Sequence, residues 1–62
     1  MPLVTIEMYE GRTVEQKRAL VDEVTKAVVK TTGTSVDHVW VVIRDVAKHN
    51  WGMKGKLCSD EG

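Results

Sequence analysis

Val39-Trp40-Val41-Val42-Ile43 is an unbroken apolar run in which four of the five residues are β-branched. Five residues are too few for a helix of this composition, so the run predicts a strand that is buried on both faces. The segments before and after this run supply the rest of the fold.

A helix is predicted ahead of this strand, over roughly residues 14–32. Thr13-Val14-Glu15-Gln16 has the pattern of a capping box, in which the first and fourth side chains each satisfy the other residue's backbone amide. Gly33 suits the left-handed conformation that commonly ends a helix. Apolar or small residues recur at steps of three and four and form one stripe: Leu20, Val24, Ala27, Val28 and Thr31.

Two further extended segments are predicted. In Leu3–Met8, the apolar residues Val4, Ile6 and Met8 alternate with polar ones, which is typical of a strand with one better-buried face, and Glu10-Gly11 ends it. After the apolar run, Asn50–Leu57 contains two glycines three residues apart, which favours a small hairpin.

This order of elements predicts an α/β (α+β) fold with one domain over residues 1–62. A single βαβ unit with parallel strands and a right-handed crossover is followed by a C-terminal β-hairpin. One helix covers only one face of a two-stranded sheet, although the second strand is apolar on both faces. We therefore expect the chain to assemble into an oligomer, with a subunit interface on the uncovered face.

Size and composition also favour self-association. A chain of 62 residues buries only about 60% of the surface that its unfolded form exposes. Cys58 is the only cysteine and cannot form a disulfide within its own chain. Cys58, His38 and His49 lack the paired spacing of metal ligands, so no metal site is expected.

Charge and hydropathy exclude other classes of partner. Nine basic and nine acidic residues cancel, which does not fit nucleic-acid binding. No apolar run approaches the ~20 residues that a membrane span needs. The first residues, M-P-L-V-T-I-E-M, lack the pattern of a signal peptide, and a lone thiol suits a reducing compartment, so we expect a cytoplasmic protein.

The backbone nitrogen of Pro2 is the most distinctive candidate for chemistry. Removal of Met1 would leave a free secondary amine, and α-amino groups have a reference pKa of about 8. An apolar pocket or a nearby cation would lower that pKa and give a neutral base near pH 7, as proton abstraction next to a carbonyl requires. Proline at position 2 also occurs in many unrelated proteins, so this residue alone does not establish the role.

Four features of the sequence occur together: Pro2, Glu10-Gly11-Arg12-Thr13, Glu15-Gln16-Lys17, and Asn50-Trp51-Gly52 ahead of Gly55. With this combination, the chain resembles the 4-oxalocrotonate tautomerase family over essentially its whole length. The resemblance implies an isomerase without a cofactor that uses Pro2 as its general base. The reaction would be a keto–enol or 1,3-proton shift in 2-oxo acids or their enols, either 2-hydroxymuconate-like or aromatic enol carboxylates. It also implies a homohexamer, a trimer of dimers, with active sites at subunit boundaries.

The same resemblance implies roles for individual side chains. Arg12 matches the arginine that holds a substrate carboxylate, and Trp51 matches the aromatic wall of the pocket. Trp40 stands where well-known members carry a second arginine, and its indole N–H is only a single neutral donor. An aromatic monocarboxylate would suit a pocket with Trp40, Trp51 and Tyr9 better than a dicarboxylate would. Alternatively, Trp40 fills space at the oligomer interface.

Two alternatives to a tautomerase remain. A secondary amine of low pKa also forms an iminium with aldehydes and supports aldol-type additions. If Met1 is retained, the nitrogen of Pro2 is locked in a tertiary amide. The chain would then be a non-catalytic oligomeric binding module.

Overall fold

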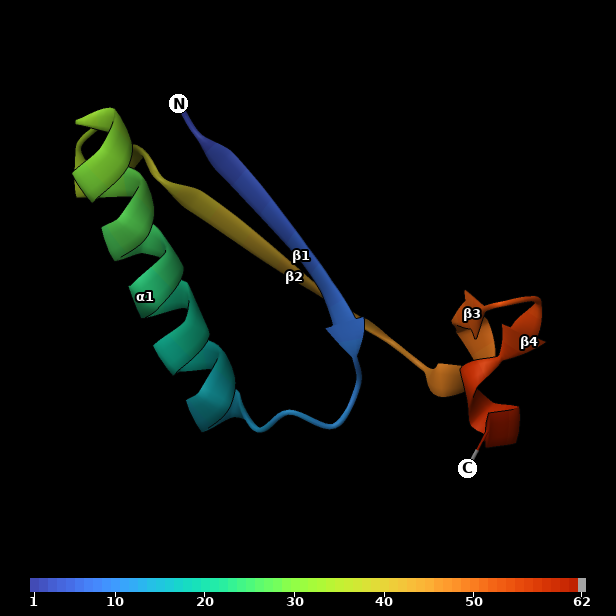
Figure 1. Ribbon diagram of the computed structural model, residues 1–62. Coiled ribbons are helices and arrows are strands. Elements are labelled where there is room, and N and C mark those ends of the chain that lie inside the picture. The colour runs from blue at the N-terminus through green and yellow to red at the C-terminus, as the bar shows by residue number, and fades with distance from the viewer. Residues whose placement is uncertain (62) are drawn as a thin grey trace.

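A parallel pair of strands lies at the centre of the structure, a computed structural model that describes residues 1–61. β1 (Leu3–Tyr9) and β2 (Trp40–Val46) pair in register from Leu3 opposite Trp40 to Tyr9 opposite Val46. The helix α1 (Val14–Thr32) lies beside this sheet, and a short turn of 3-10 helix, η1 (Val36–His38), leads from it into β2 (Figure 1). The predicted βαβ unit with parallel strands is confirmed.

Both ends of α1 are fixed by the local sequence. The hydroxyl of Thr13 accepts a hydrogen bond from the Gln16 backbone N–H at 3.1 Å, and the Gln16 side chain accepts one from the Thr13 N–H at 2.9 Å. At the other end, Gly33 adopts a φ of 76° and donates its N–H to the carbonyl of Val29. The predicted capping box, glycine cap and helix bounds are all confirmed.

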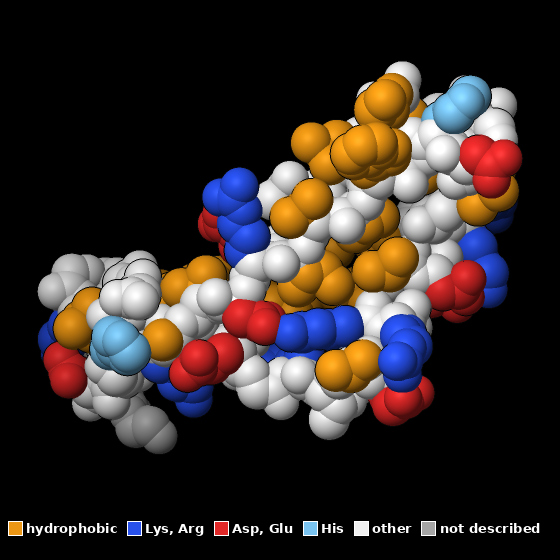
Figure 2. Space-filling view, turned by 180° about the vertical axis from the view of Figure 1, so that it is seen from behind, with side chains coloured by type: hydrophobic (Ala, Val, Ile, Leu, Met, Phe, Trp, Pro, Cys, Tyr) orange, Lys and Arg blue, Asp and Glu red, His pale blue; other side chains and the backbone are white. Residues whose placement is uncertain are grey.

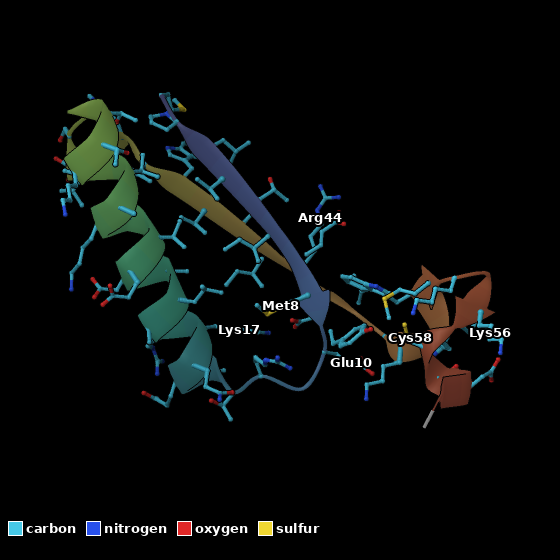
Figure 3. The ribbon with its side chains drawn as sticks, viewed as in Figure 1. Met8, Glu10, Lys17, Arg44, Lys56 and Cys58 are labelled. Carbon is cyan, nitrogen blue, oxygen red and sulfur yellow. The ribbon has the colours of Figure 1, made fainter. Side chains whose placement is uncertain are left out.

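The two faces of the sheet differ sharply in exposure. Val4, Ile6 and Met8 of β1 are half-buried on the face toward α1, where Lys17 reaches from the helix and pairs with Asp45 of β2 (Figure 3). The opposite face is uncovered, and three of its apolar side chains remain 41–60% exposed: Leu3, Trp40 and Val42.

The prediction that the second strand is buried on both faces is therefore wrong for a single chain. One helix shields one face only, and the side chains of a strand alternate between the two faces. β2 also runs three residues beyond the predicted apolar run, because the polar residues Arg44 and Asp45 still pair with Glu7 and Met8 of β1. Figure 3 shows Arg44 on the side of the sheet away from α1.

Residues 48–61 fold into a separate hairpin unit beyond the end of β2 (Figure 1). Its elements are η2 (Lys48–Asn50), β3 (Gly52–Met53), β4 (Lys56–Leu57) and η3 (Cys58–Glu61). The strands β3 and β4 are antiparallel, and the two residues between them, Lys54 and Gly55, both have positive φ angles of 54° and 79°. Such a pair fits the tight twist of a two-residue hairpin loop. The predicted hairpin is confirmed.

Charged side chains cover the outward surface of α1. Lys26 pairs with Asp22 at 2.8 Å, and Arg18 pairs with Glu15 one turn earlier. Such exposed pairs contribute little to stability, but they keep this surface solvated. No helix among residues 1–61 is long and apolar enough to cross a membrane.

Candidate active site

Pro2 lies at the start of the sheet, next to the first residue of β2. Its carbonyl accepts a hydrogen bond from the backbone N–H of Trp40 at 3.0 Å, so the two predicted site residues are tied together through the main chain. In the unprocessed chain, the nitrogen of Pro2 belongs to the peptide bond with Met1, whose side chain is exposed. An amide nitrogen is not basic, so a role as base requires removal of Met1.

Apolar side chains surround this end of the sheet. Leu3 and Trp40 are directly opposite each other in the strand register, and Val42 follows on the same face. Figure 2 shows hydrophobic side chains gathered over the half of the molecule that is away from the hairpin unit. If this surface is covered, a titratable nitrogen beside it loses hydration, which disfavours its charged form.

Tyr9, at the opposite end of β1, contacts the hairpin unit. The rings of Tyr9 and Trp51 meet edge to face, with centroids 4.7 Å apart and planes at 67°. The ammonium group of Lys48 lies 5.7 Å from the centre of the Tyr9 ring, within reach of a cation–π contact. The structure therefore brings two predicted site residues, Tyr9 and Trp51, into one aromatic cluster.

The hydroxyl of Tyr9 is already engaged within this cluster. It donates a hydrogen bond to the sulfur of Cys58 at 3.0 Å. This bond to Cys58, together with partial burial, raises the pKa of Tyr9 above its ordinary value.

Arg12 lies in the connection between β1 and α1. The preceding residue, Gly11, has a φ of 115°, which a side chain would strain, and this turn leads the chain from the sheet into the Thr13 cap. Arg12 is exposed and forms no ion pair with another side chain of the described part of the chain. Its guanidinium is therefore available to an anionic ligand.

The predicted site residues form two groups at opposite ends of β1. Pro2 and Trp40 lie at its start, whereas Tyr9, Arg12 and Trp51 lie at or beyond its end. A strand of seven residues spans about 20 Å. One chain therefore does not bring Pro2 and Arg12 into a common pocket.

The sequence pattern gives no role to two residues that contact Tyr9, namely Cys58 and Lys48. Cys58 is the one residue classed as buried among residues 1–60, with 9% of its surface exposed, and Lys48 lies in a polar turn. Tyr9 and Cys58 are 49 positions apart, so only the folded hairpin unit shows their contact. Among the described residues, no three His, Cys, Asp or Glu side chains are grouped closely enough to hold a metal ion.

Comparison with known proteins decides the family. A family model described as "Tautomerase enzyme" matches residues 2–61. The chain belongs to the tautomerase family. It is 50% identical over 60 residues to the 2-hydroxymuconate tautomerase of Bacillus subtilis strain 168, and the match covers 97% of each chain. It is 44% identical over 62 residues to the 2-hydroxymuconate tautomerase of Comamonas testosteroni, covering 100% of this chain and 98% of that one.

A solved structure of 4-oxalocrotonate tautomerase isozymes from Methylibium petroleiphilum shares the same fold. It superposes with a TM-score of 0.94 at 43% identity and covers 98% of both chains. The resemblance inferred from the sequence is thus confirmed, and membership of the tautomerase family makes this chain an isomerase.

Proposed function

We propose that this isomerase moves a proton between oxygen and carbon in a 2-oxo acid or its enol, with the nitrogen of Pro2 as general base. The observation that carries this proposal is the position of Pro2. It is tied to Trp40 by a backbone hydrogen bond and lies beside the exposed apolar side chains of Leu3 and Trp40 on the uncovered face of the sheet. Removal of Met1 converts the Pro2 nitrogen from an amide to a secondary amine.

The chemistry follows from the protonation state of that amine. A neutral amine takes the proton from the enol hydroxyl, the electron pair of the O–H bond re-forms the carbonyl, and the resulting ammonium returns a proton to carbon. The amine must be neutral at the start, so its pKa has to fall from about 8 toward neutrality or below. An apolar enclosure and a guanidinium close to the nitrogen both act in this direction.

The separation of Pro2 and Arg12 supports a site that a second copy of the chain completes. About 20 Å of strand separates the two ends, so the Arg12 and Trp51 that face a given Pro2 come from neighbouring subunits. Exposed Leu3, Trp40 and Val42 supply apolar surface for such contacts. We propose a homohexamer, arranged as a trimer of dimers, in the cytoplasm.

The substrate is a small carboxylate. Arg12 binds its carboxylate through a bidentate contact, and Trp51 walls the pocket. The names of the relatives point to 2-hydroxymuconate, whereas the neutral indole at Trp40 and the ring of Tyr9 favour an aromatic enol carboxylate. Both classes carry the enol and carboxylate groups that the mechanism needs.

The Pro2→Ala variant tests this function directly. It replaces the constrained secondary amine by a primary amine, and we expect ketonisation of an enol carboxylate to slow at least about 100-fold while the oligomer persists. Intact mass must first show that Met1 is absent from both proteins. Lys30→Ala, an exposed change on α1, is the matched control and should retain full activity.

Unchanged turnover by Pro2→Ala would rule out Pro2 as the base. Retention of Met1 in the active protein would rule it out as well. A protein that keeps Met1 and lacks activity would favour the binding module. Borohydride trapping of Pro2 with an aldehyde, read by mass, separates acid–base catalysis from iminium chemistry.

A further inference from the structure

The hairpin unit is joined to β1 by contacts that involve Tyr9. The hydrogen bond from the Tyr9 hydroxyl to the Cys58 sulfur, at 3.0 Å, is the one side-chain hydrogen bond among the described residues that links the hairpin unit to the βαβ unit. The second contact is the edge-to-face packing of Tyr9 on Trp51. Figure 3 shows Cys58 on the side of the hairpin unit that faces the end of β1.

We propose that Tyr9 is a positioning residue that sets the place of Trp51 through Cys58. This inference rests on the proposed function, in which Trp51 walls the pocket. The hydroxyl of Tyr9 holds Cys58, and Cys58 in turn donates its backbone N–H to the carbonyl of Trp51 at 2.8 Å. Together with the ring contact, these bonds close a triangle among three residues.

This triangle restrains the hairpin unit relative to β1, and the Lys48 ammonium over the Tyr9 ring adds a third contact between the same two parts. The last backbone hydrogen bond at this end of the β1–β2 sheet runs from the Glu10 N–H to the Val46 carbonyl at 3.0 Å. The hairpin unit lies beyond it in the chain. Beyond it, no backbone hydrogen bond among the described residues joins residues 48–61 to residues 1–46. A ring contact alone tolerates sliding, whereas a hydrogen bond is directional, so the hydroxyl fixes the angle of the unit.

The same geometry argues against direct binding of substrate by the Tyr9 hydroxyl. The Tyr9 hydroxyl is 3.0 Å from a partner within its own chain, and that partner, Cys58, is only 9% exposed. A pocket wall must be held within about 0.5 Å of its working position to act on a substrate. Loss of the hydroxyl therefore acts on catalysis by loosening Trp51.

A double-mutant cycle between Tyr9→Phe and Cys58→Ala tests the proposal. Each single variant should lower kcat/KM about fivefold, the factor expected for one lost neutral hydrogen bond, and the double variant should fall no further. Cys58→Ser keeps an acceptor for the Tyr9 hydroxyl. With Tyr9 intact, this variant should therefore have most of the kcat/KM that Cys58→Ala loses. Thr31→Val is the matched control, because it removes a hydroxyl that bonds only to the Ala27 carbonyl within α1.

Tryptophan fluorescence supplies a readout that is independent of activity. The chain has two tryptophans, so in a Trp40→Phe background the emission reports Trp51 alone. Collisional quenching of that emission should rise in Tyr9→Phe and in Cys58→Ala, to the same level in the double variant, and should not change in Thr31→Val.

Unchanged quenching in Tyr9→Phe, or quenching effects that add in the double variant, would overturn the positioning role. This readout remains valid even if Pro2→Ala retains full activity, a result that would overturn the proposed function alone. The two failures are therefore distinguishable.

Discussion

At the scale of single residues, the contacts that matter join positions far apart in the sequence. Pro2, Arg12 and Trp51 have proposed roles because the family pattern contains them. The bond between Tyr9 and Cys58 could not be predicted, because it depends on how the hairpin unit packs on the end of β1. No periodicity or motif relates these two positions, and neither residue alone indicates that the other is its partner.

The bond to Cys58 makes the titration of Tyr9 a direct measure of this contact. Tyr9 is the only tyrosine, so the absorbance of tyrosinate reports it alone. Its pKa is raised, so we expect a midpoint above that of free tyrosine, and Cys58→Ala should bring the midpoint back toward 10.0. A titration that is identical in both proteins would contradict the contact.

The sign of the accompanying stability change follows from linkage. The folded-state pKa of Tyr9 lies above its unfolded value, so the contribution of the bond is fully present below the ordinary tyrosine pKa. That contribution is lost as the pH rises through the raised folded-state value. Neutral and mildly acidic solutions therefore leave the Tyr9 contact intact.

At the scale of elements, the sequence predicts what local chemistry controls. The ends of α1 are set by Thr13, Gln16 and Gly33 within one turn of the helix, so its bounds could be predicted closely. The length of β2 was underestimated because Arg44 and Asp45 break the apolar run, yet pairing with β1 keeps them extended. The exposure of one face of β2 reflects tertiary geometry, since a single helix shields only one side.

Removal of the capping box tests the local control of α1. Thr13→Ala deletes one reciprocal bond and should lower the free energy of unfolding by about 1 kcal/mol, whereas Thr13→Asp should retain most of it. Denaturant unfolding at one fixed protein concentration measures the change, because an oligomer's stability depends on concentration. Equal losses in both variants would show that the cap does not act through its side-chain acceptor.

At the scale of the whole molecule, the proposed active site is incomplete in one chain. Pro2 with Trp40 and Arg12 with Trp51 lie at opposite ends of β1, and the face between them carries exposed apolar side chains toward its start. Each chain would thus contribute the base to one site and the carboxylate anchor to another. Dissociation of the oligomer is therefore predicted to abolish catalysis.

Mixing a variant that lacks the base with a variant that lacks the carboxylate anchor tests this central claim most directly, in an assay at low substrate concentration, where loss of either function lowers the rate. Pro2→Ala and Arg12→Ala chains are unfolded together, refolded at equal amounts, and assayed for ketonisation of an enol carboxylate. We predict about a quarter of the wild-type activity, because random assembly joins an intact Pro2 to a neighbour's intact Arg12 in that share of sites. A mixture no more active than the two variants refolded separately would contradict a site shared between subunits.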